Sequence, residues 1–239
     1  ILPQEMIKEE MDRRMGYIEQ IDRQEAYFLE KDNLIMAGTA EQSIGPYFAN
    51  EVLEDKGLPK RFVGFSTCFR REAGSYGKDT KGILRVHQFD KVEMFSFAHP
   101  EKSKEEHQFL LARQEEFHQK LGLPYRIVEI CGGDLGFTDA KAFDVEVWLP
   151  SEERYRETGS CSNTTDFQAR GINTRYRAEG QASTLGLVHM LNATGRAIGR
   201  TLIMIMENYQ TETGTILVPE ILIPYVGFKE ITATKFKGM

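Results

Sequence analysis

Two apolar segments separated by a glycine-rich basic loop constrain the fold of this chain more than any other feature. RFVGFSTCF (61–69) and KVEMFSFA (91–98) are rich in aromatic and β-branched residues and partly alternate between apolar and polar positions. This composition favours β-strands. We expect the two segments to pair as a long antiparallel hairpin, which would hold the loop between them at the mouth of a sheet.

The remaining pattern predicts an α+β fold, with an antiparallel sheet flanked by helices. Ser103 and Glu106 form a capping-box pattern, and near-helical apolar spacing continues to Leu121 before Gly122 and Pro124, which predicts a helix. Strands outnumber helices without a regular βαβ alternation. The other expected elements are a short helix near Ile7 to Arg14, strands at YRIVEI (125–130), AFDVEVWLP (142–150) and LGLVHML (185–191), and a largely buried helix at RAIGRTLIMIMENYQ (196–210).

Length and composition indicate one domain, spanning residues 1–239, in a reducing compartment. The chain is 41% hydrophobic, and its three cysteines lie far apart with no CxxC spacing, which argues against a disulfide framework and a zinc ribbon. No segment approaches the roughly 18 apolar residues of a membrane span, and the first residues are too charged for a signal peptide. We therefore expect a soluble, cytoplasmic protein with no membrane partner.

The basic loop CFRREAGSYGKDTKGILRVHQF (68–89) stands out because the formal net charge of the whole chain is −6. An acidic protein needs a local basic patch to meet a polyanion. Pairing of the flanking strands would bring the guanidinium groups of Arg70 and Arg85 to one end of the sheet, where they could grip phosphate oxygens. Phe89 would then offer a ring on which a base can stack. A solvated charged hairpin is the alternative interpretation, since the loop also contains Arg71, Lys78, Lys81, Gly74, Gly77 and Gly82.

Glu157 and Ser160, in RETGSCSN (156–163), place a carboxylate and a hydroxyl three residues apart. Hard oxygen ligands suit Mg²⁺, which takes much of its remaining coordination from water and substrate phosphates. The alternative is structural, since an ETGS stretch is more often a turn or a helix cap.

Two further stretches admit both a binding and a structural interpretation. In GTAEQ (38–42), Thr39 and Glu41 could bind a small cationic group or serve as an ordinary helix start. In NATGRAIGR (192–200), Asn192 and Thr194 would end a strand, and Arg200 would lie one turn into the next helix. A cation is mildly unfavourable at that end of a helix, so an anionic partner would explain Arg200.

The histidines and cysteines indicate no nucleophilic catalysis. His87 and His189 have no serine or cysteine nearby in a recognisable nucleophile setting, so we interpret them as structural. We expect the three cysteines to be small core residues.

Taken together, these stretches resemble the catalytic domain of the class II seryl-tRNA synthetases. CFRREAG with RVHQFDKVE resembles motif 2 of that class, and NATGRAIGRTLI resembles motif 3. GTAEQ, GDLGFTDAKAFDVEVWLP and YRETGSCSNTTDFQAR resemble segments of the seryl enzymes in particular. The resemblance covers residues 1–228 and implies a serine–tRNA ligase with ATP and Mg²⁺ as cofactors, L-serine and tRNA(Ser) as partners, and a homodimeric assembly.

The resemblance also assigns roles to individual residues. It implies that Arg70 holds the α-phosphate and the serine carboxylate, and that Arg85 and Arg200 hold the outer phosphates as the other catalytic residues. The residues implied for ATP are Arg70, Glu72, Arg85, Val86, Phe89, Glu157, Ser160 and Arg200, with Glu157 and Ser160 also binding Mg²⁺. Those implied for serine are Thr39, Glu41, Arg70, Glu93, Asn192 and Thr194.

The chain departs from the family pattern at two places. Met190 and Ala193 stand where the family usually has threonine and glycine, and we expect the Ala193 methyl group to narrow the serine pocket. Ile1, Leu2 and Pro3 resemble only the end of motif 1, which predicts a catalytic fragment that lacks the tRNA-binding arm and activates serine better than it charges tRNA.

Two other functions remain open at this level. A synthetase-like ligase that loads a carrier protein would also lack the tRNA-binding arm, although such relatives hold the amino acid on zinc through cysteines. A non-catalytic module could retain the fold alone. Against the first rival, Thr39 and Thr194 stand in the pocket positions and no cysteine does. Against the second, the chain keeps a full set of residues for ATP: Arg70, Glu72, Arg85, Glu157 and Arg200.

Overall fold

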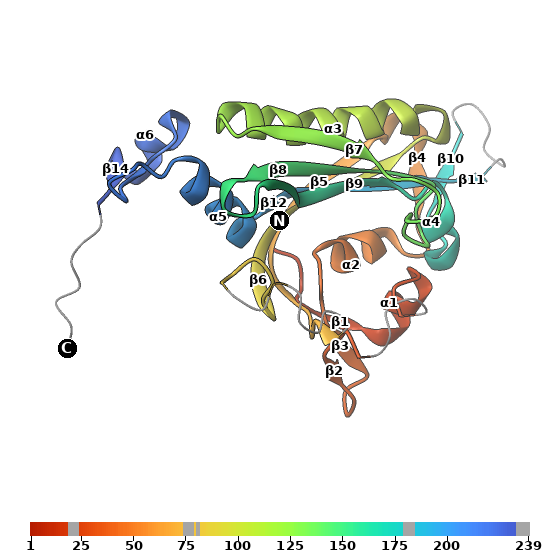
Figure 1. Ribbon diagram of the computed structural model, residues 1–239. Helices are drawn as coiled ribbons and strands as arrows, with labels where there is room; N and C mark the ends of the chain where they lie inside the picture. Colours follow the sequence, from red (N-terminus) through yellow and green to blue (C-terminus); the bar gives the residue numbers. More distant parts are fainter. Residues whose placement is uncertain (19–23, 74–78, 80–81, 179–184, 233–239) are drawn as a thin grey trace.

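The centre of the computed structural model is a six-stranded antiparallel sheet with the strand order β5-β6-β12-β9-β8-β7 (Figure 1). The structure describes residues 1–18, 24–73, 79, 82–178 and 185–232, so Gly74, Gly77, Lys78 and Lys81 of the basic loop lie outside it. The predicted α+β fold with a large antiparallel sheet is confirmed. The strands are β5 (Lys60–Phe69), β6 (Gln88–Ala98), β7 (Tyr125–Glu129), β8 (Lys141–Leu149), β9 (Arg154–Asn163) and β12 (His189–Ala197).

Shorter elements surround this sheet. The small sheets have the orders β1-β3-β2, β11-β10-β4 and β13-β14. Their strands are β1 (Met6–Lys8), β2 (Phe28–Leu29), β3 (Leu34–Met36), β4 (Val52–Glu54), β10 (Arg175–Arg177), β11 (Leu185–Leu187), β13 (Ile216–Leu217) and β14 (Glu230–Ile231). The helices are α1 (Glu9–Arg14), α2 (Glu41–Ile44), α3 (Ser103–Lys120), α4 (Phe167–Ile172), α5 (Ile198–Asn208) and α6 (Ile223–Val226).

The predicted hairpin is confirmed as the pair β5 and β6, which stay in continuous register from Lys60 opposite Phe97 to Phe69 opposite Gln88. Because successive side chains of a strand point to opposite faces, odd-numbered residues of β6 share one face of the sheet. On that face Phe95 and Phe97 pack into an apolar core with Ile44 of α2. Phe89, Lys91 and Glu93 continue the same face toward the loop end of the hairpin.

Helix α3 covers the opposite face of the sheet (Figure 1). Its buried Leu110 and Leu111 pack against Met94 of β6 and against Leu191 and Ala193 of β12. The helix is predicted correctly, but its capping box is wrong. The Ser103 hydroxyl contacts His189 Nδ1 at 2.8 Å, and Glu106 accepts hydrogen bonds from Arg61 and Ser96 at 2.7 Å, because both side chains turn toward the sheet.

Three other expectations need correction. The run 185–191 is not one strand, since the chain changes sheets at the buried Val188: β11 pairs with β10, whereas β12 pairs with β6 and β9. Helix α5 is not largely buried, because it contacts the core through Met204 and Ile205 while Leu202 and Met206 are exposed. The ETGS stretch is neither a turn nor a helix cap, because it lies within β9.

In Figure 1, α2, α1 and the sheet β1-β3-β2 lie on the side of the central sheet that α3 leaves open. No helix within the described part of the chain is long and apolar enough to cross a membrane. Strand β6 contacts both α2 and α5. The predicted site residues gather between these elements, at the end of the β5–β6 hairpin that carries the loop.

Candidate active site

The loop end of the β5–β6 hairpin brings Arg70 and Arg85 together, as the strand pairing predicts. The backbone N–H of Arg70 donates to the carbonyl of His87 at 2.9 Å, which extends the hairpin beyond its last ladder pair. The Arg70 guanidinium donates through Nε to the Gly38 carbonyl at 3.1 Å and lies 5.4 Å from the centre of the Phe89 ring. Arg85 forms an ion pair with Glu72, which raises the pKa of the arginine.

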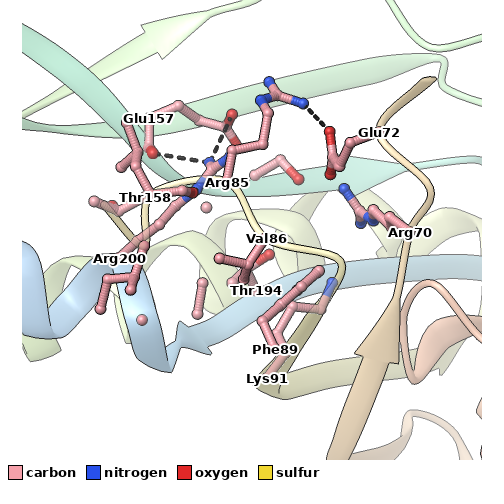
Figure 2. Close-up of a pocket in the computed structure, with 16 residues that line it drawn as sticks. Arg70, Glu72, Arg85, Val86, Phe89, Lys91, Glu157, Thr158, Thr194 and Arg200 are labelled. Atoms are coloured by element: carbon pink, nitrogen blue, oxygen red, sulfur yellow. Dashed lines mark hydrogen bonds and ion pairs between the residues drawn. The ribbon is translucent and has the colours of Figure 1, made fainter. Parts of the chain in front are cut away.

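Arg200 joins these two arginines from the first turn of α5. Its Nη1 donates to the Glu157 carbonyl at 3.0 Å and lies 3.2 Å from the Glu157 carboxylate, while Nε reaches the Leu84 carbonyl at 3.4 Å. The anionic partner that the sequence suggests for this arginine is therefore Glu157 in this structure. Figure 2 shows the two ion pairs, Arg85 with Glu72 and Arg200 with Glu157, on the wall of one cavity.

A β-bulge in β9 places Glu157 and Ser160 on the same wall. Gly159 lies opposite Val145 and Glu157 lies opposite Glu146, so Thr158 is an extra residue in β9. Residues three apart in a regular strand face opposite sides of the sheet, but one extra residue between them reverses this relation. The Thr158 hydroxyl donates to the Val145 carbonyl at 3.0 Å and contacts His118 Nε2 at 3.1 Å.

The neighbouring glycine allows β9 and β12 to approach closely. A Cβ added at Gly159 would lie 2.7 Å from Thr194 Cβ, which is closer than real contacts allow. Gln114 of α3 ties the same two strands together, since its Nε2 donates to the Ser160 carbonyl at 2.9 Å and to the Thr194 carbonyl at 2.8 Å. Helix α3 thus holds in place the wall that carries Glu157, Ser160 and Thr194.

These elements enclose a cavity of about 220 Å³, which we call the arginine cavity. It is polar where the arginines and Glu157 meet and apolar where Val86 and Phe89 contribute. All eight residues that the resemblance implies for ATP line it: Arg70, Glu72, Arg85, Val86, Phe89, Glu157, Ser160 and Arg200.

A second cavity of about 490 Å³, which we call the carboxylate cavity, adjoins the first. It lies between α2 and the strands β6 and β12. All six residues that the resemblance implies for serine line it: Thr39, Glu41, Arg70, Glu93, Asn192 and Thr194. The two cavities share Arg70, Glu72, Arg85, Lys91, Ser160 and Thr194, so a single ligand can extend from one into the other.

Two buried glutamates, Glu41 and Glu93, line the carboxylate cavity. Glu41 accepts hydrogen bonds from Asn192 Nδ2 at 2.9 Å and from Gln168 Nε2 at 3.1 Å. Burial and then the negative charge of Glu93 raise the pKa of Glu41 to about 7. An ammonium group placed here would relieve both the desolvation and the repulsion between the two carboxylates.

The sequence leaves two roles open for Thr39, a helix start and a binding residue, and its hydroxyl has contacts that suit both. It accepts a hydrogen bond from the Glu41 backbone N–H at 3.4 Å at the start of α2, and it donates to Glu93 Oε2 at 3.3 Å. It therefore helps to start the helix and also lines the cavity.

The sequence alone misses several polar residues that build this cavity. Gln42 Oε1 accepts from the backbone N–H groups of Gly38 at 2.6 Å and Thr39 at 3.2 Å, while its Nε2 donates to Asp12 Oδ1 at 2.7 Å. Burial raises the pKa of Asp12 to about 7. In the sequence, Gln42 is marked only by its position four residues after Gly38, at the end of GTAEQ (38–42). Lys91 and Gln168 stand inside stretches that resemble the family, but nothing in the sequence assigns them a role, and Tyr17 and Gln114 stand outside those stretches.

The predicted effect of Ala193 on the pocket is wrong. Ala193 and Met190 are fully buried, and Ala193 packs with Leu191 in the core beneath α3. Because side chains alternate along β12, Ala193 faces away from the cavity that Asn192 and Thr194 line. Met190 packs with Phe95 and Phe97 in the core beside α2.

The histidines and two of the cysteines lie where a structural role predicts. His87 Nδ1 contacts the Arg70 carbonyl at 3.2 Å, and His189 contacts Ser103. Cys68 and Cys161 are buried free thiols, whereas Cys131 is exposed, so the prediction of a core role is wrong for Cys131. Within the described residues, no group of three or more His, Cys, Asp or Glu side chains could hold a metal ion.

The antiparallel sheet, the arginines at the loop end of its hairpin and the adjoining carboxylate cavity agree with the core of an aminoacyl-tRNA synthetase. Residues 27–209 match the tRNA synthetase class II core domain family (G, H, P, S and T). The chain belongs to this family.

The individual relatives are more specific. The serine–tRNA ligase of Thermotoga neapolitana is 52% identical over 208 residues, which are 87% of this chain and 49% of that protein. The crystal structure of seryl-tRNA synthetase from Pyrococcus horikoshii complexed with ATP matches with a TM-score of 0.94 and 43% identity, over 98% of this chain and 52% of that one. The cytoplasmic serine–tRNA ligase of Naegleria fowleri in complex with AMP matches with a TM-score of 0.91 and 40% identity, over 98% and 55%. The chain spans about half the length of the curated relatives that it matches.

Proposed function

We propose that this chain carries the site at which a serine–tRNA ligase activates L-serine with ATP to seryl-adenylate. The observation that carries the proposal is that Arg70 lines both cavities: the arginine cavity, suited to a nucleotide, and the carboxylate cavity, suited to a small amino acid. The high identity to serine–tRNA ligases supports the same assignment.

The arginine cavity would bind ATP. The base would stack on Phe89 beside Val86, with Glu72 accepting a hydrogen bond from it. Arg70 would hold the α-phosphate, and Arg85 and Arg200 the outer phosphates. Because Arg85 and Arg200 already bind Glu72 and Glu157, the triphosphate would exchange with these carboxylates or share the arginines with them.

The carboxylate cavity would bind serine. Its ammonium group suits Glu41 and Thr39, its carboxylate suits Arg70, and its hydroxyl suits Glu93 and Thr194, with Asn192 holding Glu41 in place. A cavity built to pair a hydroxyl rejects alanine and glycine strongly, because its buried polar groups would otherwise stay unpaired.

The chemistry needs no general base. The carboxylate of serine is already ionised at neutral pH and attacks the α-phosphorus of ATP, while pyrophosphate leaves. Bringing two anions together requires positioning and charge neutralisation, which Arg70, Arg85 and Arg200 supply. This requirement agrees with the structural role of the histidines.

Glu157 and Ser160 would hold Mg²⁺. The β-bulge places their hard oxygen donors on one cavity wall, and Mg²⁺ takes few protein ligands beside substrate phosphates. The negative charge already gathered here supports a cation site, because burial and the charge of Glu157 raise the pKa of nearby Asp144 to about 6. When bound, the ion would neutralise the outer phosphates.

The whole protein would then transfer the seryl group to tRNA(Ser), as a homodimer in the cytoplasm. The transfer to tRNA and the cytoplasm rest on the names of the relatives, which are serine–tRNA ligases, one of them cytoplasmic, and the homodimer rests on the resemblance to the seryl enzymes. They apply to a protein about twice the length of this chain.

Pyrophosphate exchange tests the proposal directly. The chain should exchange labelled pyrophosphate into ATP when serine is present, and much less with alanine or glycine at the same concentration. Exchange that is independent of the amino acid, or faster with another amino acid, would contradict the serine assignment.

A further inference from the structure

Lys91 is a charged residue of the site that the functional assignment has not used. It lies on the same face of β6 as Phe89 and Glu93 and lines both cavities. Figure 2 shows it beside Phe89 in the arginine cavity. Its side chain is 9% exposed and that of Glu93 is 1% exposed. Lysine is almost never buried to this degree unless it is paired.

The partner of Lys91 is one particular oxygen of Glu93. Lys91 Nζ lies 2.5 Å from Glu93 Oε2, and the same oxygen accepts the hydrogen bond of Thr39 at 3.3 Å. Among the residues that the structure describes, none forms a hydrogen bond with Glu93 Oε1. The carboxylate therefore has one anchored oxygen and one oxygen available to a ligand of the carboxylate cavity.

This arrangement separates the tasks of two neighbouring carboxylates. Glu41 accepts hydrogen bonds from Asn192 and Gln168 and pairs with no lysine or arginine in the described part of the chain, whereas Glu93 pairs with Lys91. An ammonium group is attracted to the carboxylate that lacks a cation, whereas a hydroxyl needs only an oriented acceptor. Neutralising Glu93 thus directs the ammonium group of a ligand to Glu41 and its hydroxyl to Glu93.

We propose that Lys91 is a specificity-determining positioning residue, which anchors Glu93 Oε2 so that Oε1 accepts the hydroxyl hydrogen of serine. This inference rests on the proposed function, since it names the atom that recognises the serine side chain. Lys91 acts through Glu93 and does not itself touch the hydroxyl.

The test compares Lys91→Met, Lys91→Arg and Glu93→Gln with the double variant Lys91→Met/Glu93→Gln in pyrophosphate exchange. In Lys91→Met the KM for serine should rise about tenfold or more and the preference for serine over alanine should fall by a similar factor, while the KM for ATP changes less than about twofold. Lys91→Arg should restore most of the preference. In the Glu93→Gln background, Lys91→Met should add less than about a twofold change.

Lys102→Met is a matched control, because Lys102 also pairs with a glutamate, Glu105, but on the exposed surface of the molecule at 3.5 Å. Thermal unfolding of each variant identifies a folding defect. Lys91→Met alone leaves the buried Glu93 carboxylate without its cation, whereas the double variant removes both charges of this pair and so stays informative if Lys91→Met is unstable.

The outcomes separate this inference from the proposed function. If the unmodified chain shows no serine-dependent exchange, the proposed function is wrong and the role of Glu93 Oε1 falls with it. If the unmodified chain is active and Lys91→Met changes the KM for ATP more than that for serine, or if its effect persists in full without Glu93, then Lys91 does not act through Glu93 and only this inference is wrong.

Discussion

Neighbouring residues of strand β12 face two different environments, the apolar core beneath α3 and the carboxylate cavity. Leu191 and Ala193 are fully buried against Leu110 and Leu111 of α3, in a core without charge. Asn192 and Thr194, one residue away, line the acidic cavity on the other face. The comparison teaches that one strand both stabilises the fold and presents the site, and that the alternation of side chains keeps the two tasks apart.

The two sides also differ in their buried ionisable groups. On the cavity side, burial raises the pKa of Asp12 and of Glu41 to about 7. On the α3 side, burial lowers the pKa of His118 to about 4 and also lowers that of His107. The acidic groups on the cavity side should therefore lower the free energy of unfolding as the pH rises, and the histidines on the α3 side should lower it as the pH falls.

The largest effect should come from Arg70→Ala, which acts on the cavity side alone. Arg70 is exposed and contacts both cavities, so its loss should leave unfolding unchanged and reduce the rate of pyrophosphate exchange by about a hundredfold or more, on the order of 3 kcal/mol in the transition state. Arg71→Ala is the matched control, since Arg71 is a neighbouring exposed arginine that lines neither cavity. Exchange at a near-parental rate in Arg70→Ala would contradict the assignment of the cavity side to catalysis.

Leu110→Ala should have the opposite profile, because Leu110 is buried on the α3 side. We expect the free energy of unfolding to fall by about 3 kcal/mol, the usual cost of such a cavity, with the KM for serine unchanged. Leu202→Ala, at a leucine that is 48% exposed on α5, should cost much less. A large change in serine affinity for Leu110→Ala would mean that the α3 face also shapes the site. Chemical denaturation and exchange kinetics on the same preparations decide this.

Asp12→Asn should remove part of the stability loss at rising pH. In the folded chain Asp12 keeps its proton up to a pH of about 7, whereas an unfolded aspartate loses it near its ordinary pKa of 3.8. The folded state thus binds more protons in this window, so its stability falls as the pH rises from about 4 to about 7. We expect Asp12→Asn to be more stable than the parent at pH 8 by roughly 1 kcal/mol, less than the full shift because the surroundings relax around a buried charge. An unchanged pH profile of the unfolding free energy would contradict this assignment.

His118→Gln should have the smallest effect, in the opposite pH window. The histidine stays neutral in the folded chain down to a pH of about 4, whereas an unfolded histidine takes up a proton near 6.5. The unfolded state binds more protons between these values, so stability falls as the pH drops through them. The variant should lose roughly 1 kcal/mol less than the parent between pH 7 and pH 5, because a glutamine cannot titrate there. Urea unfolding at the two pH values measures this difference, and an equal loss in parent and variant would argue against it.

The sequence predicts the regular parts of the fold because their signals are local. The hairpin of β5 and β6 follows from two apolar segments with partial alternation, and α3 follows from its apolar spacing and its glycine stop. The same local reasoning fails at Ser103 and Glu106, since a capping pattern does not show that both side chains have partners on the sheet.

The candidate site divides in the same way. Its residues could be named because they stand in motifs that resemble a known family, and the structure brings all of them to the two cavities. The residues that support them could not be named. Gln42, Gln114 and Gln168 each have a partner far away in the sequence, at 30, 80 and 127 positions, and the bulge at Thr158 is not encoded in any short pattern.

A crystal structure of the chain with a non-hydrolysable analogue of seryl-adenylate tests the central claim most directly. The account predicts that the adenine stacks on Phe89 in the arginine cavity, that Arg70 contacts the link between the nucleotide and the amino acid, and that the serine hydroxyl lies within hydrogen-bond distance of Glu93 Oε1. An analogue bound with its serine portion outside the carboxylate cavity would contradict the account.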